Sequence, residues 1–165
     1  MTDLPITICQ VRTPEGMKHY VTLLPPDQAF SRGIAPEAVV GVLLRPLQPG
    51  EAVTPSVFAR NRVFVEFLHG VIGREAPRQP GLQAEARRLG DGWVYVIDQR
   101  TPTPDGPVPP EDIMGAFEVK DGQVVAGSYR PNPRHLILSP NGFFRLDAGL
   151  LECLLRAMRT RCSGP

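Results

Sequence analysis

Cysteine, lysine and long apolar runs are all scarce in this chain of 165 residues. The three cysteines, Cys9, Cys153 and Cys162, are odd in number, far apart and without a Cys-x-x-Cys pair. Neither a disulfide framework nor a zinc knuckle is therefore expected. We expect inert thiols in a reducing compartment, which makes a cytoplasmic location the default.

No apolar run approaches the roughly 18 residues of a membrane-spanning helix, and the short run over 6–11 is too polar for a signal peptide. The net charge is only +1, so no overall field attracts nucleic acid or an anionic membrane surface. The expected partner is therefore a protein or a small polar ligand, and not a nucleic acid or a membrane.

The common motifs of nucleotide and metal chemistry are also missing. The sequence has no phosphate-binding loop, dinucleotide-binding glycine motif, nucleophile elbow or His-Glu-x-x-His motif. The three histidines, His19, His69 and His135, are isolated from one another. These absences argue against the commonest nucleotide-dependent enzymes and metallohydrolases, and we expect no cofactor and no metal site.

Turn-forming residues are plentiful: 19 prolines and 16 glycines make 35 of the 165 residues, beside a hydrophobic content of 42%. This apolar content and length suit one core, with many loops rather than disorder. We therefore expect a single domain over residues 1–165.

The first third of the chain predicts paired strands. β-Branched residues in 6–11 and apolar residues in 20–24 flank the turn formers of 13–16, which is typical of a hairpin. The continuous apolar run 38–44 is typical of a strand buried on both faces.

Helical spacing of apolar residues predicts a long central helix over about 55–74, with Thr54 as its cap. The segment 83–89 contains good helix formers, although a strand is an alternative there. A C-terminal helix is expected over about 147–160, because Asp147 can cap it and leucines form one stripe along it. The tail 161–165 is expected to fray.

Between these helices the sequence predicts a central strand over 93–97, followed by a proline-rich surface loop over 101–112. Arg-Thr-Pro at 100–102, where this loop starts, repeats the Arg-Thr-Pro of the turn at 12–16. Either an internal repeat or two similar turns would account for this likeness. Further strand pairs are predicted on either side of Asp121-Gly122 and, over 135–138 and 143–146, on either side of a Pro-Asn-Gly turn.

This order of elements predicts an α+β domain. An antiparallel or mixed sheet would be covered on one face by the long central helix, with the C-terminal helix packed on it.

Polar residues gather around the proline-rich loop and the stiff turn at 130–135, where rigid strands would present them. If the fold brings these segments together, Asp98 and His135 are the catalytic candidates. The binding candidates are Arg100, Asp105, Glu111, Asp112, Arg130 and Arg134.

Three hypotheses follow for what this surface does. The first is a non-catalytic binding or protein-interaction module that presents 99–112 and the 130–135 turn to a partner. The alternative is a small cofactor-independent hydrolase or isomerase, with Asp98 or His135 carrying the proton and an arginine stabilising an oxyanion. The same residues could instead simply pair, as Asp98 with Arg100, to satisfy polar groups. A homodimer formed through the C-terminal helix is also possible.

Overall fold

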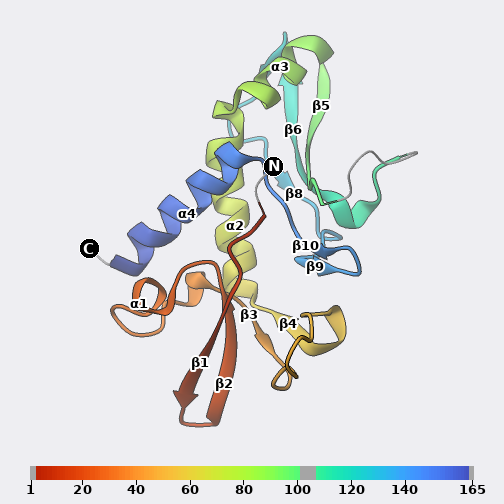
Figure 1. The fold of residues 1–165 in the computed structure, drawn as a ribbon. Helices are drawn as coiled ribbons and strands as arrows, with labels where there is room; N and C mark the ends of the chain where they lie inside the picture. The colour runs from red at the N-terminus through yellow and green to blue at the C-terminus, as the bar shows by residue number, and fades with distance from the viewer. Residues whose placement is uncertain (1–2, 101–106, 164–165) are drawn as a thin grey trace.

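Strands and helices are interleaved in the computed structural model, which describes residues 3–100 and 107–163 (Figure 1). The named strands pair antiparallel and helices cover them, so the fold class is α+β, as the sequence predicts. Figure 1 shows one sheet at each end of the long helix α2 (Arg62–Glu75), and the C-terminal helix α4 (Ala148–Ser163) beside α2. These two helices connect the sheets into one body.

The first sheet has the strand order β1-β2-β3-β4. It contains β1 (Thr7–Thr13), β2 (Gly16–Thr22), β3 (Val39–Leu43) and β4 (Phe58–Arg60). The predicted N-terminal hairpin is confirmed, because β1 and β2 pair in continuous register across the turn. β3 is almost entirely buried, as its apolar run predicts.

The second sheet centres on β6 (Ile113–Lys120), which pairs with β5 (Gly92–Ile97), β7 (Gln123–Val124) and β8 (Arg130–Pro131). Asp121 and Gly122 have φ angles of 53° and 75°, the positive values that a tight hairpin turn requires. The hairpin predicted from this dipeptide is confirmed.

β5 lies at the edge of this sheet, whereas the sequence predicts a central strand over 93–97. Within the described residues β5 pairs with β6 alone. Trp93 and Tyr95 are exposed, while Val94 and Val96 are buried, so the strand has a single buried face. The prediction was wrong because large aromatic residues extend the apolar run although their side chains lie outside the core.

The last predicted strand pair is present but shorter than expected. It forms a ribbon of β9 (Leu138–Ser139) and β10 (Gly142–Phe143), with the Pro-Asn-Gly turn between them.

Helix α2 begins seven residues later than the sequence predicts. Pro55–Val57 forms a short 3₁₀ turn (η2), and the next three residues pair with β3 as β4. The Asn61 side-chain oxygen then accepts a hydrogen bond from the Val63 N–H at 3.3 Å and caps the helix. The apolar residues of β4 continue the helical spacing of α2, so periodicity alone could not reveal the break.

Helix α4 begins where the sequence predicts, since the Leu150 N–H donates to Asp147 Oδ1 at 2.9 Å. It ends later than predicted. The expected frayed tail at 161–165 is instead helical as far as Ser163, and Cys162 is buried with its carbonyl accepting a hydrogen bond from Ser31 Oγ at 3.2 Å.

The remaining short elements connect these parts. The predicted helix over 83–89 is confirmed and belongs to the longer α3 (Pro80–Leu89). The others are α1 (Pro26–Ala29) and the 3₁₀ turns η1 (Pro36–Ala38), η3 (Ala76–Arg78) and η4 (Pro110–Asp112).

One hydrophobic core runs through both sheets and the helices between them. Its largest fully buried side chains include Phe64 and Leu68 of α2, Phe117 of β6, and Leu154 and Met158 of α4. Burial of such side chains is the main source of stability in a domain of this size. Among the described residues no helix has the length and apolarity needed to cross a bilayer.

Candidate functional site

Four ionisable side chains meet in the interior where β5 ends. Arg100 lies between two carboxylates, with Nη2 at 3.0 Å from Asp98 Oδ2 and Nε at 2.8 Å from Asp112 Oδ1. His135 Nε2 is 2.8 Å from Asp98 Oδ2. At most 2% of any of these four side chains is exposed. We call Asp98, Arg100, Asp112 and His135 the buried network.

Arg100 also donates hydrogen bonds to backbone carbonyl groups around it. Its guanidinium donates to the carbonyl oxygens of Gly142 at 2.8 Å, Glu111 at 2.7 Å and Leu136 at 2.5 Å. Asp98 Oδ1 in turn accepts hydrogen bonds from the Arg100 and Arg145 N–H groups, at 3.0 and 2.8 Å. The buried network therefore ties the end of β5 to η4 and to the segment carrying β9 and β10.

The buried network also sets the tautomer of His135. His135 Nε2 also lies 3.3 Å from Arg100 Nη2, whose two protons have shorter contacts with the Glu111 and Leu136 carbonyls. A carboxylate can only accept a hydrogen bond, so the shorter contact of Nε2 is a donation from its N–H to Asp98. Nδ1 is then the remaining nitrogen that can accept a hydrogen bond or bind a proton. A carboxylate that orients an imidazole in this way is also found in acid–base sites.

The structure brings some of the sequence candidates together and separates others. Asp98, Arg100, Asp112 and His135 form the buried network, to which Glu111 contributes only its backbone carbonyl. The other two arginine candidates lie elsewhere. The Arg130 guanidinium lies 5.0 Å from the centre of the Trp93 ring, and Arg134 is exposed.

Asp105 and the rest of 101–106 lie outside the described residues, as does most of the second copy of the Arg-Thr-Pro echo. The described part of the proline-rich loop, 107–112, ends in η4. Arg100 and Asp112, predicted as binding residues, are therefore interior groups whose charges are met by one another and by the backbone.

A cavity of about 430 Å³ adjoins the buried network at His135. The start of α2 and the segment 131–137 form its walls. Arg60, Arg62, His69 and His135 are among the residues that line it, and no carboxylate residue is found in its lining within the part of the chain that the structure describes. We call this space the anion cavity. Neither Arg60 nor Arg62 makes a side-chain hydrogen bond or ion pair with any residue that the structure describes, so both guanidiniums are available to a ligand.

His69 is held in its neutral form beside the anion cavity. Burial, together with the nearby charge of His135, lowers the pKa of His69 to about 4. Its Nδ1 lies 2.7 Å from the hydroxyl of Tyr129, whose pKa is raised by burial. The phenol therefore stays protonated, and its one proton can be donated either to His69 Nδ1 or to the Met114 carbonyl oxygen, which lies 3.4 Å away.

Stability should fall in mild acid because of His69. A histidine in an unfolded chain has a pKa near 6.5. Between about pH 6.5 and pH 4, His69 is therefore protonated in the unfolded chain but neutral in the folded one, so protonation favours unfolding. The expected loss from this residue is about 3 kcal/mol across that window. Urea unfolding across the window should show a shallower pH slope for His69→Gln than for the unmodified protein. Equal slopes would show that His69 does not titrate this way.

Sequence reasoning missed the two arginines of the anion cavity. With the helix predicted to start at 55, Arg60 and Arg62 lie on its polar side among other charged residues. In the structure Arg62 is instead the first helical residue of α2, and Arg60 ends β4. A basic residue at a helix start is unfavourable and could have served as a signal, but only once the start was known.

In the ranges 3–100 and 107–163, no three or more His, Cys, Asp or Glu residues are arranged so that they could hold a metal ion. Comparison with known proteins adds no assignment: no protein-family model, no curated protein and no solved structure matches this chain.

Proposed function

We propose that this chain is a non-catalytic binding module, and that the anion cavity takes a ligand carrying a carboxylate or phosphate group. The observation that carries the proposal is a lining that contains two arginines and two histidines but, among the described residues, no carboxylate. Guanidinium groups form bidentate hydrogen bonds with both kinds of anion. The cavity volume of about 430 Å³ lies in the range of small-molecule sites.

The position of Arg62 supports this proposal. The N-terminus of a helix carries a partial positive charge, so an acidic residue there stabilises the helix and a basic one weakens it. The first turn of α2 contains no acidic residue, and Arg62 is its first member. A basic residue that weakens the helix start and also lines a cavity is better explained by ligand binding than by stability. The helix terminus adds to the same positive potential.

Charge reversal at Arg62 should therefore separate binding from stability. In Arg62→Glu, affinity for inorganic phosphate and for succinate should fall at least tenfold, while the free energy of unfolding stays equal or rises by a few tenths of a kcal/mol. Arg60→Glu should weaken binding similarly. Isothermal titration calorimetry gives the affinity, and urea unfolding gives the stability.

Arg12→Glu is the matched control, because Arg12 is an exposed arginine of β1 and its reversal changes the net charge equally. It should leave binding unchanged. Tighter binding of phosphate would point to a phosphorylated ligand, and tighter binding of succinate to a carboxylate ligand. Unchanged binding of both anions in Arg62→Glu and Arg60→Glu would refute the proposal.

One observation favours a second function, the cofactor-independent hydrolase or isomerase. His135 is one of the residues that line the cavity, and Asp98 orients its buried imidazole as a carboxylate orients a general base. Arg100 does not fit the part of an oxyanion partner, because its donors are already engaged by Asp98 and three carbonyl groups. If the chain hydrolyses an activated ester such as p-nitrophenyl acetate, and His135→Gln abolishes this while Arg12→Glu does not, the enzymatic function replaces the binding module.

A further inference from the structure

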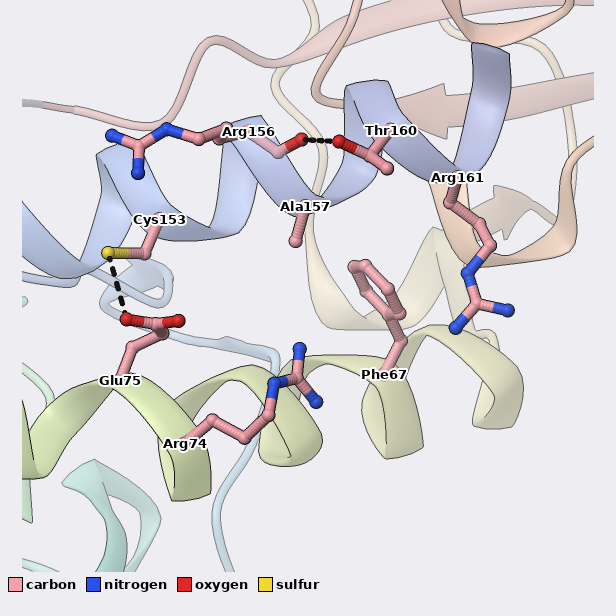
Figure 2. A pocket seen from close by; sticks show the side chains of 8 residues that line it. All are labelled: Phe67, Arg74, Glu75, Cys153, Arg156, Ala157, Thr160 and Arg161. Atoms are coloured by element: carbon pink, nitrogen blue, oxygen red, sulfur yellow. Dashed lines mark hydrogen bonds between the residues drawn. The ribbon is translucent and has the colours of Figure 1, made fainter. Parts of the chain in front are cut away.

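A second hollow lies between helices α2 and α4, away from the anion cavity. It is a groove of about 530 Å³ to which α2 contributes Phe67, Arg74 and Glu75 and α4 contributes Cys153, Arg156 and Arg161. Figure 2 shows Phe67 pointing from α2 toward α4, with the guanidinium of Arg74 on one side of its ring and that of Arg161 on the other. We call this space the helix groove.

The helix groove has a net positive lining. Its three arginines and one glutamate give a formal charge of +2. The Arg74 side chain has no hydrogen bond or ion pair with a described residue. Arg156 and Arg161 make only long contacts, at 4.0 Å to Glu152 and 3.9 Å to Glu37. Exposed pairs at such distances contribute little stability, so these cations can change partners at low cost.

Among the described residues that line the helix groove, Glu75 supplies the one carboxylate, and its side-chain contacts are also long. Glu75 Oε2 lies 3.8 Å from Cys153 Sγ and 3.9 Å from Arg78 Nη1. Figure 2 shows Glu75 and Cys153 facing one another at one end of the groove, whereas Phe67 and Arg161 lie at the other. The end nearer Phe67 therefore combines an apolar surface with cations. The guanidinium carbon of Arg161 already lies 5.8 Å from the centre of the Phe67 ring.

The spacing of the cations favours an extended ligand over a single phosphate. A phosphate is best held by guanidiniums that converge on one point, but Arg74 and Arg161 lie on opposite sides of Phe67 (Figure 2). Along α4 the stretch from Cys153 to Arg161 spans about 12 Å at 1.5 Å per residue. An extended peptide covers that distance in about four residues.

We propose that the helix groove binds an acidic segment of a partner protein. Two carboxylates of this segment would meet Arg74 and Arg161, and an apolar side chain between them would contact Phe67. In peptide recognition, complementary charges commonly fix the register of the peptide, and an apolar side chain then makes its contact at a defined position. The proposal uses none of the residues of the anion cavity and does not depend on it.

The test uses the full chain and a fluorescein-labelled peptide, Glu-Leu-Glu-Leu-Glu, with Lys-Leu-Lys-Leu-Lys as the control peptide. The acidic peptide should bind at least tenfold more tightly in fluorescence anisotropy. Arg74→Glu and Arg161→Glu should each reduce its affinity at least fivefold, whereas Arg12→Glu should not. Thermal unfolding of each variant confirms that it is folded.

Cys153 gives an independent readout of occupancy. It lines the groove and is partly exposed, whereas Cys9 and Cys162 are buried. Burial and the Glu75 carboxylate raise the pKa of Cys153, so its alkylation by iodoacetamide is followed at alkaline pH by mass spectrometry. Bound acidic peptide should slow its alkylation severalfold.

Three results would overturn the proposal: no protection of Cys153 by the acidic peptide, unchanged peptide affinity in both arginine variants, or equal protection by inorganic phosphate alone. The last would identify a site for small anions. Because none of these readouts uses Arg60 or Arg62, failure of the helix groove leaves the proposed function of the anion cavity untouched.

Discussion

Arg100→Met is expected to destabilise the fold by about 3–5 kcal/mol, the loss that follows removal of one partner from a buried ion pair. The side chain is 1% exposed and lies between the carboxylates of Asp98 and Asp112. Methionine fills much of the same volume but supplies no charge, so two buried carboxylates would remain without their cation. Three backbone carbonyls would lose their donor as well.

Urea unfolding measures this loss, and Arg88→Met is the matched control. Arg88 pairs with Glu85 on the surface and its side chain is 73% exposed, so its replacement should change stability by less than about 1 kcal/mol. Neutralising both carboxylates in the Arg100→Met background, with Asp98→Asn and Asp112→Asn, should recover part of the loss. A loss below about 1 kcal/mol for Arg100→Met would mean that the buried network does not hold this region together.

Gly115→Ala is expected to cost about 1–3 kcal/mol through overpacking and to weaken anion binding at the same time. A Cβ at this position would lie 2.6 Å from the Arg130 carbonyl oxygen and from the ring and hydroxyl of Tyr129. The carbonyl belongs to β8, which is paired with β6 at this point, so it cannot move without breaking the pairing. Tyr129 would then be displaced from His69.

Gly81→Ala makes the same chemical change where there is room. No atom lies within 4 Å of the added methyl group, and the position is helical, so the variant should be as stable as the original or gain up to about 1 kcal/mol. Urea unfolding and phosphate titration of both variants check the prediction. Equal stability and equal phosphate affinity for Gly115→Ala and Gly81→Ala would contradict the close packing of Tyr129.

Local chemistry explains which parts of the fold the sequence predicts well. The Asp121-Gly122 turn and the Asp147 cap depend on neighbouring residues alone, and both occur as predicted. The start of α2 depends on pairing between β4 and β3, which are far apart in the chain. The spacing of apolar residues contains no information on such pairing, so the predicted helix ran through β4.

The candidate site also contains features that depend on neighbouring residues and features that depend on tertiary structure, and only the former could be predicted. The position of Asp98 and His135 in loops made a meeting between them a reasonable hypothesis, and the structure joins them at 2.8 Å. The burial of Arg100 could not be predicted, because arginine is rarely buried and its partners come from three separate segments. The approach of Arg60 and Arg62 to His135 likewise depends on tertiary structure.

Histidine side-chain NMR during a titration with inorganic phosphate and succinate tests the anion cavity most directly. His69 and His135 line the cavity, whereas His19 lies on β2 outside it and is an internal control. We predict saturable shifts of the His69 and His135 imidazole signals, with His19 unchanged, and loss of these shifts in Arg62→Glu. Signals that stay in place with both anions, or that move equally for all three histidines, would contradict an anion site at this cavity.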